Sequence, residues 1–405
     1  MIELVAQQGY KAVKVRELVR LASVSTRTFY ERFESKEDCL LQTYDAITRG
    51  ATKRIFDSQA DASDPRDRQS LIIRALMREL KSGPEAARLV LVDAPDASSA
   101  ALEHVRRAER SLEARFSECL ARPPGGILMP PLVVEGVVAG VIGTVRSWLL
   151  ADRGSALDGL QDELANWALC YPSAVAVGLA ELDGKSVWRN TAFEPLSMPI
   201  GSANGMAADD RALILAAVAE LSAGHDYANL TTARVRARSG VTRRKFETHF
   251  VGIEDCFLAS LELRSREALA QITRAKAAGR TWPGGIYRSI VALSDHVARD
   301  RFLAKICLHE DLGLGARIAK GRQHLIATLI EQLVEGAPDS TRQGRSFTEA
   351  TASAVWTLFC RYVLGDSGLK VNSASTLAYI ALAPTIGASA AMTSISEEQA
   401  PSARD

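Results

Sequence analysis

The stretch from Val15 to Phe33, VRELVRLASVSTRTFYERF, decides the fold of the first part of this chain. Apolar residues recur at helical spacing over its first eight positions, which predicts a short helix with one buried face. Ser23-Val24-Ser25 interrupts that pattern, and Ser25 is a favourable N-cap for a second helix. Phe29 and Phe33 lie four residues apart, so they share one face of the second helix and form its structural core. The stretch is therefore predicted to be two short helices joined by a tight turn.

The first turn of the second helix carries short polar residues and one arginine: Thr26, Arg27 and Thr28. A helix that reads DNA needs this division, because its apolar side must be locked to a partner helix while its polar side faces the groove. Arginine can bind a guanine edge with two hydrogen bonds, and threonine hydroxyls can contact phosphates or bases. The pattern favours a DNA-binding helix-turn-helix.

These motifs, with their neighbours, resemble the DNA-binding signature of the TetR family of bacterial regulators. The resemblance spans about 40 residues and rests on Gly9-Tyr10, Val15–Leu18, Val24-Ser25, Thr28–Tyr30, Phe33 and Ser35–Glu37. It implies that the DNA contacts come from Ser25, Thr26, Arg27, Thr28, Tyr30 and Lys36. Two positions depart from the family pattern: Lys14 replaces a capping threonine or serine, and Ser23 replaces a glycine in the turn.

Length and composition permit at least two domains. The chain has 405 residues, and its 49 basic and 48 acidic side chains nearly cancel, so only local charge can indicate a DNA surface. From Lys11 to Lys36 there are seven basic and three acidic residues, a balance of +4. The six cysteines are widely spaced, which argues against a disulfide framework or zinc site and favours a reducing cytoplasm. The resemblance to bacterial regulators implies that the protein is associated with the nucleoid.

Chemistry-bearing motifs of enzymes are not found in the sequence, so we expect no enzyme, cofactor or metal site. His309-Glu310-Asp311 is the one local cluster of that kind, but consecutive residues of a helix point to different faces. Gly125-Gly126 and Gly284-Gly285 follow prolines and are predicted to form turns. The apolar run from Leu132 to Leu150 contains Glu135, Arg146 and several glycines, which favours a core or interface helix over a membrane span.

The sequence repeats itself when the numbering is shifted by 217. Tyr10 then meets Tyr227, Arg27 meets Arg244, Phe29 meets Phe246 and Phe33 meets Phe250, without a gap. The predicted fold is accordingly all-α, with two TetR-like units fused in tandem, each a helix-turn-helix head on a helical ligand-binding and dimerisation domain. The register also makes the first helix of the first unit about eight residues shorter than its counterpart, so either the true start of the chain lies upstream, which we expect, or this helix is short.

The second head diverges from the first. Thr242 can cap its reading helix and is followed by Arg243, Arg244 and Lys245, all candidate DNA contacts, with Phe246 and Phe250 as core. Residues 228–253 contain six basic side chains and one acidic, a balance of +5. However, Glu247 replaces the tyrosine and Ile253 the lysine of the first head, so this head either contacts DNA or is degenerate.

The domain boundaries follow from this repeat and from composition. We expect the first head at 1–45, its helical domain at 46–182, a linker rich in Pro, Gly and Ser at 183–205, the second head at 206–262, its helical domain at 263–393, and a polar tail at 394–405. A polar loop with Pro65 is expected at 61–68. Interface helices are predicted at 132–151, 157–170, 347–365 and 373–383. Gly136, Gly140 and Gly143 would allow another helix to approach the first of these closely.

The expected function is sequence-specific transcription regulation through double-stranded operator DNA, as a repressor released by a small-molecule effector of unknown identity. Family resemblance alone places that effector in the helical domains, where candidate pocket residues are Tyr44, Trp148, Trp282, Tyr287 and Trp356, although aromatic residues at helical spacing are usually core. The units would pair either within one chain, as a pseudo-dimer, or between chains, as a homodimer. The alternative is an effector- or protein-binding module whose heads no longer read DNA.

Overall fold

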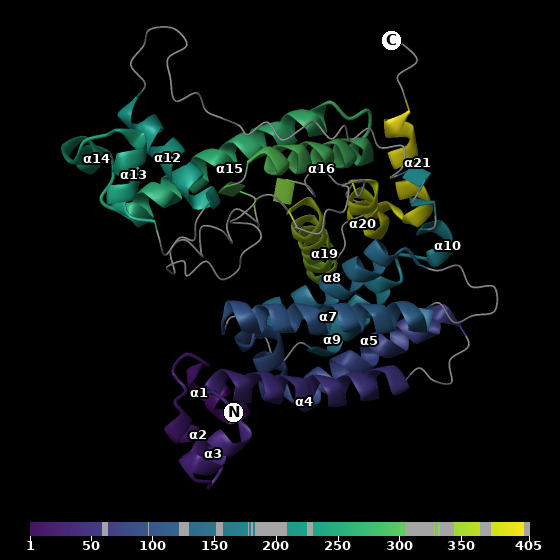
Figure 1. Cartoon of the computed structure of the whole chain (residues 1–405). Helices are drawn as coiled ribbons and strands as arrows, with labels where there is room; N and C mark the ends of the chain where they lie inside the picture. The colour runs from purple at the N-terminus through teal and green to yellow at the C-terminus, as the bar shows by residue number, and fades with distance from the viewer. Residues whose placement is uncertain are drawn as a thin grey trace. The chain divides into compact units, whose positions relative to one another are not determined.

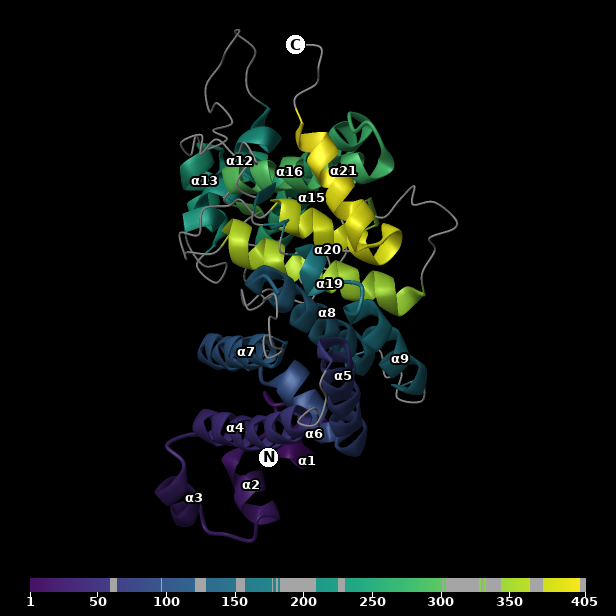
Figure 2. The ribbon, with the colours of Figure 1, turned by 90° about the vertical axis from the view of Figure 1, so that its right-hand side faces the viewer.

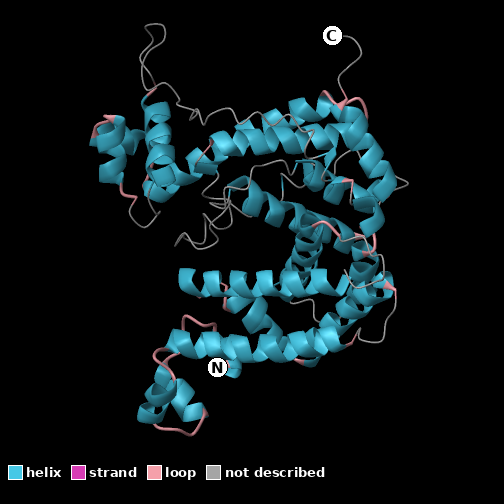
Figure 3. Cartoon of the chain, turned by 45° about the vertical axis from the view of Figure 1, so that its right-hand side comes forward, coloured by secondary structure: helices cyan, strands magenta, loops and turns pink. Residues whose placement is uncertain are grey.

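The structure is a computed structural model that describes residues 1–58, 64–95, 97–120, 129–150, 157–176, 178–179, 181–182, 209–224, 230–300, 302–303, 328, 331–332, 344–364 and 374–400. Within these ranges every regular element is helical, as predicted (Figure 3). The expected linker at 183–205 and the cluster at 309–311 lie outside them. The chain divides into two compact units: Met1–Gly178 with Gln343–Val355, and Leu179–Arg342 with Trp356–Asp405.

Unit 1 carries the first head at one end of a long helix, α4, and α7 lies alongside that helix (Figure 2). The core of the head, which includes Phe29 and Leu40, continues into Leu89 and Val105 of the larger domain. The elements are α1 (Ile2–Gln8), α2 (Val15–Leu21), α3 (Thr26–Arg32), α4 (Lys36–Asp57), α5 (Pro65–Ser82), α6 (Pro84–Arg88), the π-helix η1 (Leu89–Asp93), α7 (Ser99–Leu120), α8 (Pro131–Leu150), α9 (Leu157–Ala168) and α10 (Ser173–Ala176).

Unit 1 also contains the first half of α19 (Arg345–Leu364), which packs against α8 and α9. A Cβ added to Gly140 of α8 would lie 2.2 Å from Cη2 of Trp167 and 2.8 Å from the carbonyl oxygen of Ala350. The Trp167 Nε1–H donates a buried hydrogen bond of 3.0 Å to Oγ1 of Thr351. Glycine is therefore required at Gly140 because a neighbouring helix passes almost against its backbone.

Unit 2 begins with the second head and is dominated by the adjacent pair α15 and α16, with α20 and α21 packed on α16 (Figure 1). Phe257 of α15 and Phe302 lie edge to face in its core, with ring centroids 5.3 Å apart. The elements are α12 (Asp210–Gly224), α13 (Thr232–Ser239), α14 (Arg243–His249), α15 (Ile253–Ala277), α16 (Trp282–Arg299), the second half of α19, α20 (Ala374–Ile386) and α21 (Ala388–Gln399).

Three local predictions differ from the structure. Helix α5 begins at Pro65, inside the expected loop, since proline is tolerated in the first turn of a helix. Gly284 and Gly285 belong to α16, where Thr281 caps the helix by accepting from the Gly284 N–H, and do not form a turn. Helix α21 extends to Gln399 and buries Ile395, so residues 394–399 are not part of a polar tail.

Candidate nucleic-acid interface

The first head positions α3 through a side-chain cap and an aromatic anchor. Ser25 Oγ accepts a hydrogen bond of 3.0 Å from the Thr28 N–H, as the sequence predicts for an N-cap. Phe29 is 5% exposed, and its ring lies 5.2 Å from that of Phe33 and 5.3 Å from that of Tyr30. One side of α3 is thereby fixed to the head, and the other is presented to solvent.

The turn between α2 and α3 is a Schellman motif with a serine in the position that usually holds glycine. The Val24 N–H bonds to the carbonyl of Val19 at 3.0 Å, and the Ser23 N–H bonds to that of Arg20 at 3.2 Å. Ser23 has φ 54°, which lies in the left-handed region that disfavours residues with a Cβ. The head therefore contains local strain at the turn that sets the angle between its two helices.

The predicted contact residues Ser25, Thr26, Arg27, Thr28 and Tyr30 are all exposed. The Arg27 side chain is 89% exposed, and its Nε lies 3.0 Å from Oε1 of Glu31 one turn later. Tyr30 is 55% exposed although its ring edge contacts Phe29. This surface offers one guanidinium, one phenol and several hydroxyls, which are groups that contact base edges and phosphates.

Lys36 is placed differently from a lysine that faces a phosphate. Its Nζ donates to the carbonyl oxygens of Tyr10 at 3.1 Å and Val13 at 2.9 Å, and lies 4.2 Å from the centroid of the Tyr10 ring. Two of its three N–H groups therefore tie the loop before α2 to the start of α4. A DNA contact by Lys36 stays a prediction.

Helix α2 lacks a side-chain N-cap because the Lys14 ammonium has no acceptor. Glu17 compensates in part, since its Oε2 accepts from the Lys14 backbone N–H at 2.8 Å, a bond that lowers the pKa of Glu17. In the second head Thr231 occupies the same register position and accepts from the Arg234 N–H at 3.3 Å.

The second head has the same local construction. Thr242 caps α14 by accepting from the Lys245 N–H, and Phe246 is buried beneath the helix. Arg243 and Lys245 are exposed but form ion pairs, at 2.7 Å with Glu247 and at 3.0 Å with Asp210. The sequence analysis did not predict the partners of these cations. The pair with Glu247 could have been found from its i,i+4 spacing, whereas Asp210 is 35 residues from Lys245 and gives no local signal.

The five aromatic pocket candidates are divided between the units. Tyr44 is 3% exposed in the core of unit 1, edge to face with His104 at 5.7 Å, and burial raises its pKa. Tyr287 is buried in unit 2, where its hydroxyl lies 3.1 Å from Nε2 of Gln399. Trp148 in unit 1 is half-buried, as are Trp282 and Trp356 in unit 2. These contacts are those of core packing, and a ligand role stays a prediction.

Among the described helices, α8 is the one long and apolar enough to cross a membrane, and 56% of its apolar window is buried within the fold. Length and composition alone are weak evidence for a span, because buried core helices have the same properties. Across the described ranges, no group of three or more His, Cys, Asp or Glu side chains is arranged to hold a metal ion.

Comparison with known proteins identifies the first head. Residues 2–43 match the profile described as bacterial regulatory proteins of the tetR family. A solved structure of the fatty acid degradation regulator FadR from Bacillus halodurans aligns with 42% of this chain and 93% of its own, at 15% identity and a TM-score of 0.37. That score is too low to establish a shared fold. The profile match and the geometry of α1 to α3 agree that the chain begins with a TetR-type helix-turn-helix domain.

Proposed function

We propose that this protein is a sequence-specific DNA-binding regulator of transcription whose first head contacts operator DNA through α3. The observation that carries the proposal is the exposed surface of α3, with Arg27 and Tyr30 presented from a helix that Phe29 anchors, inside the stretch that matches the TetR profile. The polar groups on this surface are suited to base edges and phosphates.

The test is DNA binding by wild type and by a variant with Arg27→Ala and Tyr30→Ala. Fluorescence anisotropy with duplex DNA from the gene's upstream region, and with a genomic fragment library, should show binding that weakens steeply with salt. The double variant should lose sequence-specific binding while its circular dichroism is unchanged, because both side chains are largely exposed. Unchanged affinity in the variant would refute the role of α3, and absent binding by wild type would favour a module that recognises an effector or protein without DNA.

We further propose that a small effector bound in the helical domain releases the DNA, so that the protein acts as a repressor. Support comes from the physical continuity of head and domain in unit 1. His104 Nε2 of α7 lies 2.7 Å from Oδ1 of Asp45 on α4, and Ser98 bonds to Glu37 near the start of α4. A displacement of α7 would therefore act directly on the helix that carries the head.

The tandem organisation is also a proposal, supported by helix boundaries. Shifting by 217 carries α3 at 26–32 onto α14 at 243–249, and α5 at 65–82 onto α16 at 282–299. The first residue of α9 is carried onto that of α20 in the same way. A single register across three helices is expected of a duplicated unit with few insertions.

We propose that the two repeats pair within one chain as a pseudo-dimer. The contacts of Gly140 and Trp167 with Ala350 and Thr351 support this arrangement, since they join helices of the first repeat to a helix of the second. Light scattering at micromolar concentration separates the alternatives. A particle of about 44 kDa, one chain of 43.7 kDa, is expected, whereas twice that mass would establish a homodimer of whole chains.

A further inference from the structure

The second head reproduces the first in local geometry although the TetR profile match ends at residue 43. Phe246 and Phe250 have centroids 5.9 Å apart at 49°, compared with 5.2 Å and 46° for Phe29 and Phe33. Gly240 has φ 71° at the register position of Ser23, so the turn follows the same left-handed path.

The start of the following helix shares one hydrogen bond in the two heads. The Val251 N–H donates to Oδ2 of Asp255 at 3.1 Å, as the Glu34 N–H donates to Asp38 at 2.9 Å. The N-caps differ, because the Ser35 side chain caps α4 whereas Gly252 provides no side-chain cap for α15. The helix-turn-helix of the second head is intact from its turn through α14.

The acidic residue that would oppose DNA in this head is neutralised. Glu247 replaces Tyr30, and an isolated carboxylate on α14 would repel phosphates. Its Oε1 instead lies 2.7 Å from Nε of Arg243, one turn earlier on the same exposed face. Together Arg243 and Glu247 carry no net charge. In the folded head, Glu247 is therefore not an isolated negative charge that would repel DNA phosphates.

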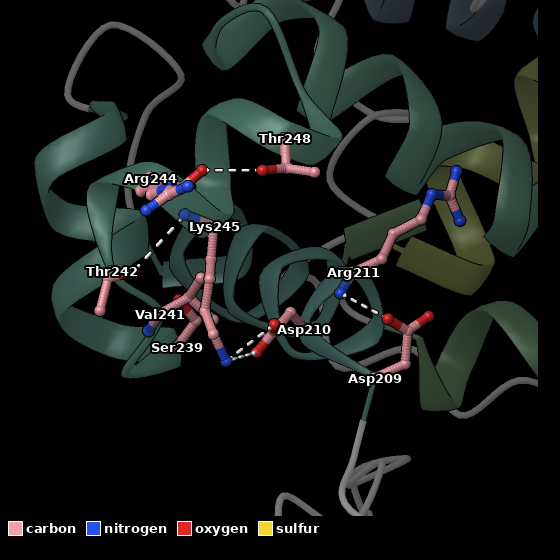
Figure 4. Close-up of polar contacts among 9 residues, drawn as sticks. All are labelled: Asp209, Asp210, Arg211, Ser239, Val241, Thr242, Arg244, Lys245 and Thr248. Carbon is pink, nitrogen blue, oxygen red and sulfur yellow. Dashed lines mark hydrogen bonds and ion pairs between the residues drawn. The ribbon is translucent and has the colours of Figure 1, made fainter.

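Lys245 also forms an ion pair, which connects the reading helix α14 to α12. Its side chain extends to Asp210 at the start of α12, with Nζ 3.0 Å from a carboxylate oxygen (Figure 4). Asp210 is the first residue of α12, which runs for fifteen residues. The ion pair therefore connects α14 to the first turn of α12.

Arg244 is the cation that remains. It is exposed on α14, and its side chain makes no hydrogen bond or ion pair with any residue of the described ranges, while its carbonyl accepts from Thr248 Oγ1 at 2.9 Å (Figure 4). It occupies the register position of Arg27, whose guanidinium is paired with Glu31. A guanidinium without an intramolecular partner can bind O6 and N7 of guanine in the major groove without first breaking an ion pair.

We propose that residues 230–256 form a second duplex-DNA-binding head, with Arg244 as its base-reading residue and a sequence preference different from that of the first head. This inference rests on the proposed function, in which the first head binds operator DNA, and adds the second head as a reader of the same operator. The two reading surfaces differ where Glu247 replaces Tyr30, and where Arg243 and Lys245 replace Thr26 and Thr28. Because operator symmetry follows protein symmetry, the site bound by one chain consists of two unlike half-sites.

The experiment is selection of bound duplexes from a random-sequence pool by the full chain, followed by affinity measurements on the selected duplexes. Three variants are compared with wild type: Arg244→Ala, Arg27→Ala with Tyr30→Ala, and Arg274→Ala. Arg274 is the matched control, since it removes the same charge from an exposed site on α15, about 30 Å along the helix from Ile253 at ~1.5 Å per residue.

Wild type should select a motif with two different halves. Arg244→Ala should weaken binding about 10-fold and lose base preference in one half alone, because a bidentate arginine–guanine contact has that order of effect. The double variant of the first head should lose preference in the other half, and Arg274→Ala should match wild type. Circular dichroism melts establish that each variant is folded.

If wild type selects a motif and Arg244→Ala behaves like Arg274→Ala, the second head does not read DNA, and the proposed function through the first head stands. A symmetric motif with two identical halves also overturns the inference. If wild type selects no duplex at all, the proposed function and the inference both fall.

Discussion

Replacing Ser23 by glycine is expected to stabilise the first head, and replacing Gly240 by serine is expected to destabilise the second by a similar amount. Both residues occupy the turn of a helix-turn-helix in the left-handed region, with φ 54° and 71°. A Cβ added at Gly240 would meet no atom within 4 Å, so the exchange tests backbone conformation without a steric clash.

The magnitude follows from two opposing effects. A residue with a Cβ pays roughly 1–2 kcal/mol in the left-handed region, which glycine avoids. Glycine in turn makes the unfolded chain more disordered, which costs about 0.4–1 kcal/mol. The net change is ~0.5–1 kcal/mol in favour of glycine at either position.

A buried cysteine in each head provides the assay. Cys39 and Cys256 occupy the same register position, are 6% and 0% exposed, and have thiol pKa values raised by burial, that of Cys256 to about 12. Alkylation of either thiol in the native protein therefore requires its head to open. The expected free-energy change corresponds to about a 2- to 5-fold change in labelling rate, read by peptide mass spectrometry.

Ser23→Gly should slow labelling of Cys39 and leave Cys256 unchanged, whereas Gly240→Ser should speed labelling of Cys256 and leave Cys39 unchanged. Ser23→Ala, which keeps a Cβ, is the control and should behave nearly as wild type. Equal effects of Ser23→Gly and Ser23→Ala on Cys39, or no effect of Gly240→Ser on Cys256, would refute the reasoning from backbone strain.

Three other perturbations have defined outcomes. Lys14→Thr should stabilise the first head by about 1 kcal/mol by restoring the cap that Thr231 provides in the second, seen as slower labelling of Cys39; a rate equal to that of wild type would mean that Glu17 already satisfies the helix end. Gly140→Ala should destabilise unit 1 by about 1–3 kcal/mol in chemical denaturation, because the new methyl group overlaps Trp167 and Ala350, whereas Gly159→Ala, where an added Cβ meets nothing within 4 Å, should not. Burial lowers the pKa of His296; the carboxylates of Asp300 and Glu267 oppose this shift, and Arg264 and Arg299 add to it. The unfolded chain therefore takes up a proton more readily than the folded chain, and unit 2 should lose stability as the pH falls below 6.5. His296→Gln should flatten that part of a stability–pH curve, and an unchanged curve would contradict the assignment.

The local structure of both heads was predictable because short-range rules govern it. Ser25 and Thr242 cap their helices as predicted, and Phe29 and Phe246 are buried. Capping and i,i+4 pairing depend on residues a few positions apart, so one sequence contains enough information to infer them.

The features that were not predicted depend on distant or competing partners. Lys36 is drawn to carbonyls 23 and 26 residues away, and Lys245 to Asp210, neither of which leaves a local pattern. Leu89–Asp93 continues the helical pattern after Pro84, but no local signal in the sequence indicates that it winds as a π-helix, in contact with α4 and α8. For the same reason, the sequence could nominate aromatic residues for a pocket without showing that Tyr44 and Tyr287 are buried in core packing.

The division of α19 has a consequence for synthesis on the ribosome. Unit 1 is completed by residues up to Val355, which follow Gly178 by 177 positions in the chain. Because translation proceeds at about 5–20 residues per second, the segment that covers the glycine-bearing face of α8 is synthesised roughly 10–35 s after the rest of unit 1. A nascent chain released or cleaved in that interval would leave Gly140 of α8 and Trp167 of α9 without Ala350 and Thr351, which pack against them, so we expect the newly made first half to depend on chaperones more than the finished protein does.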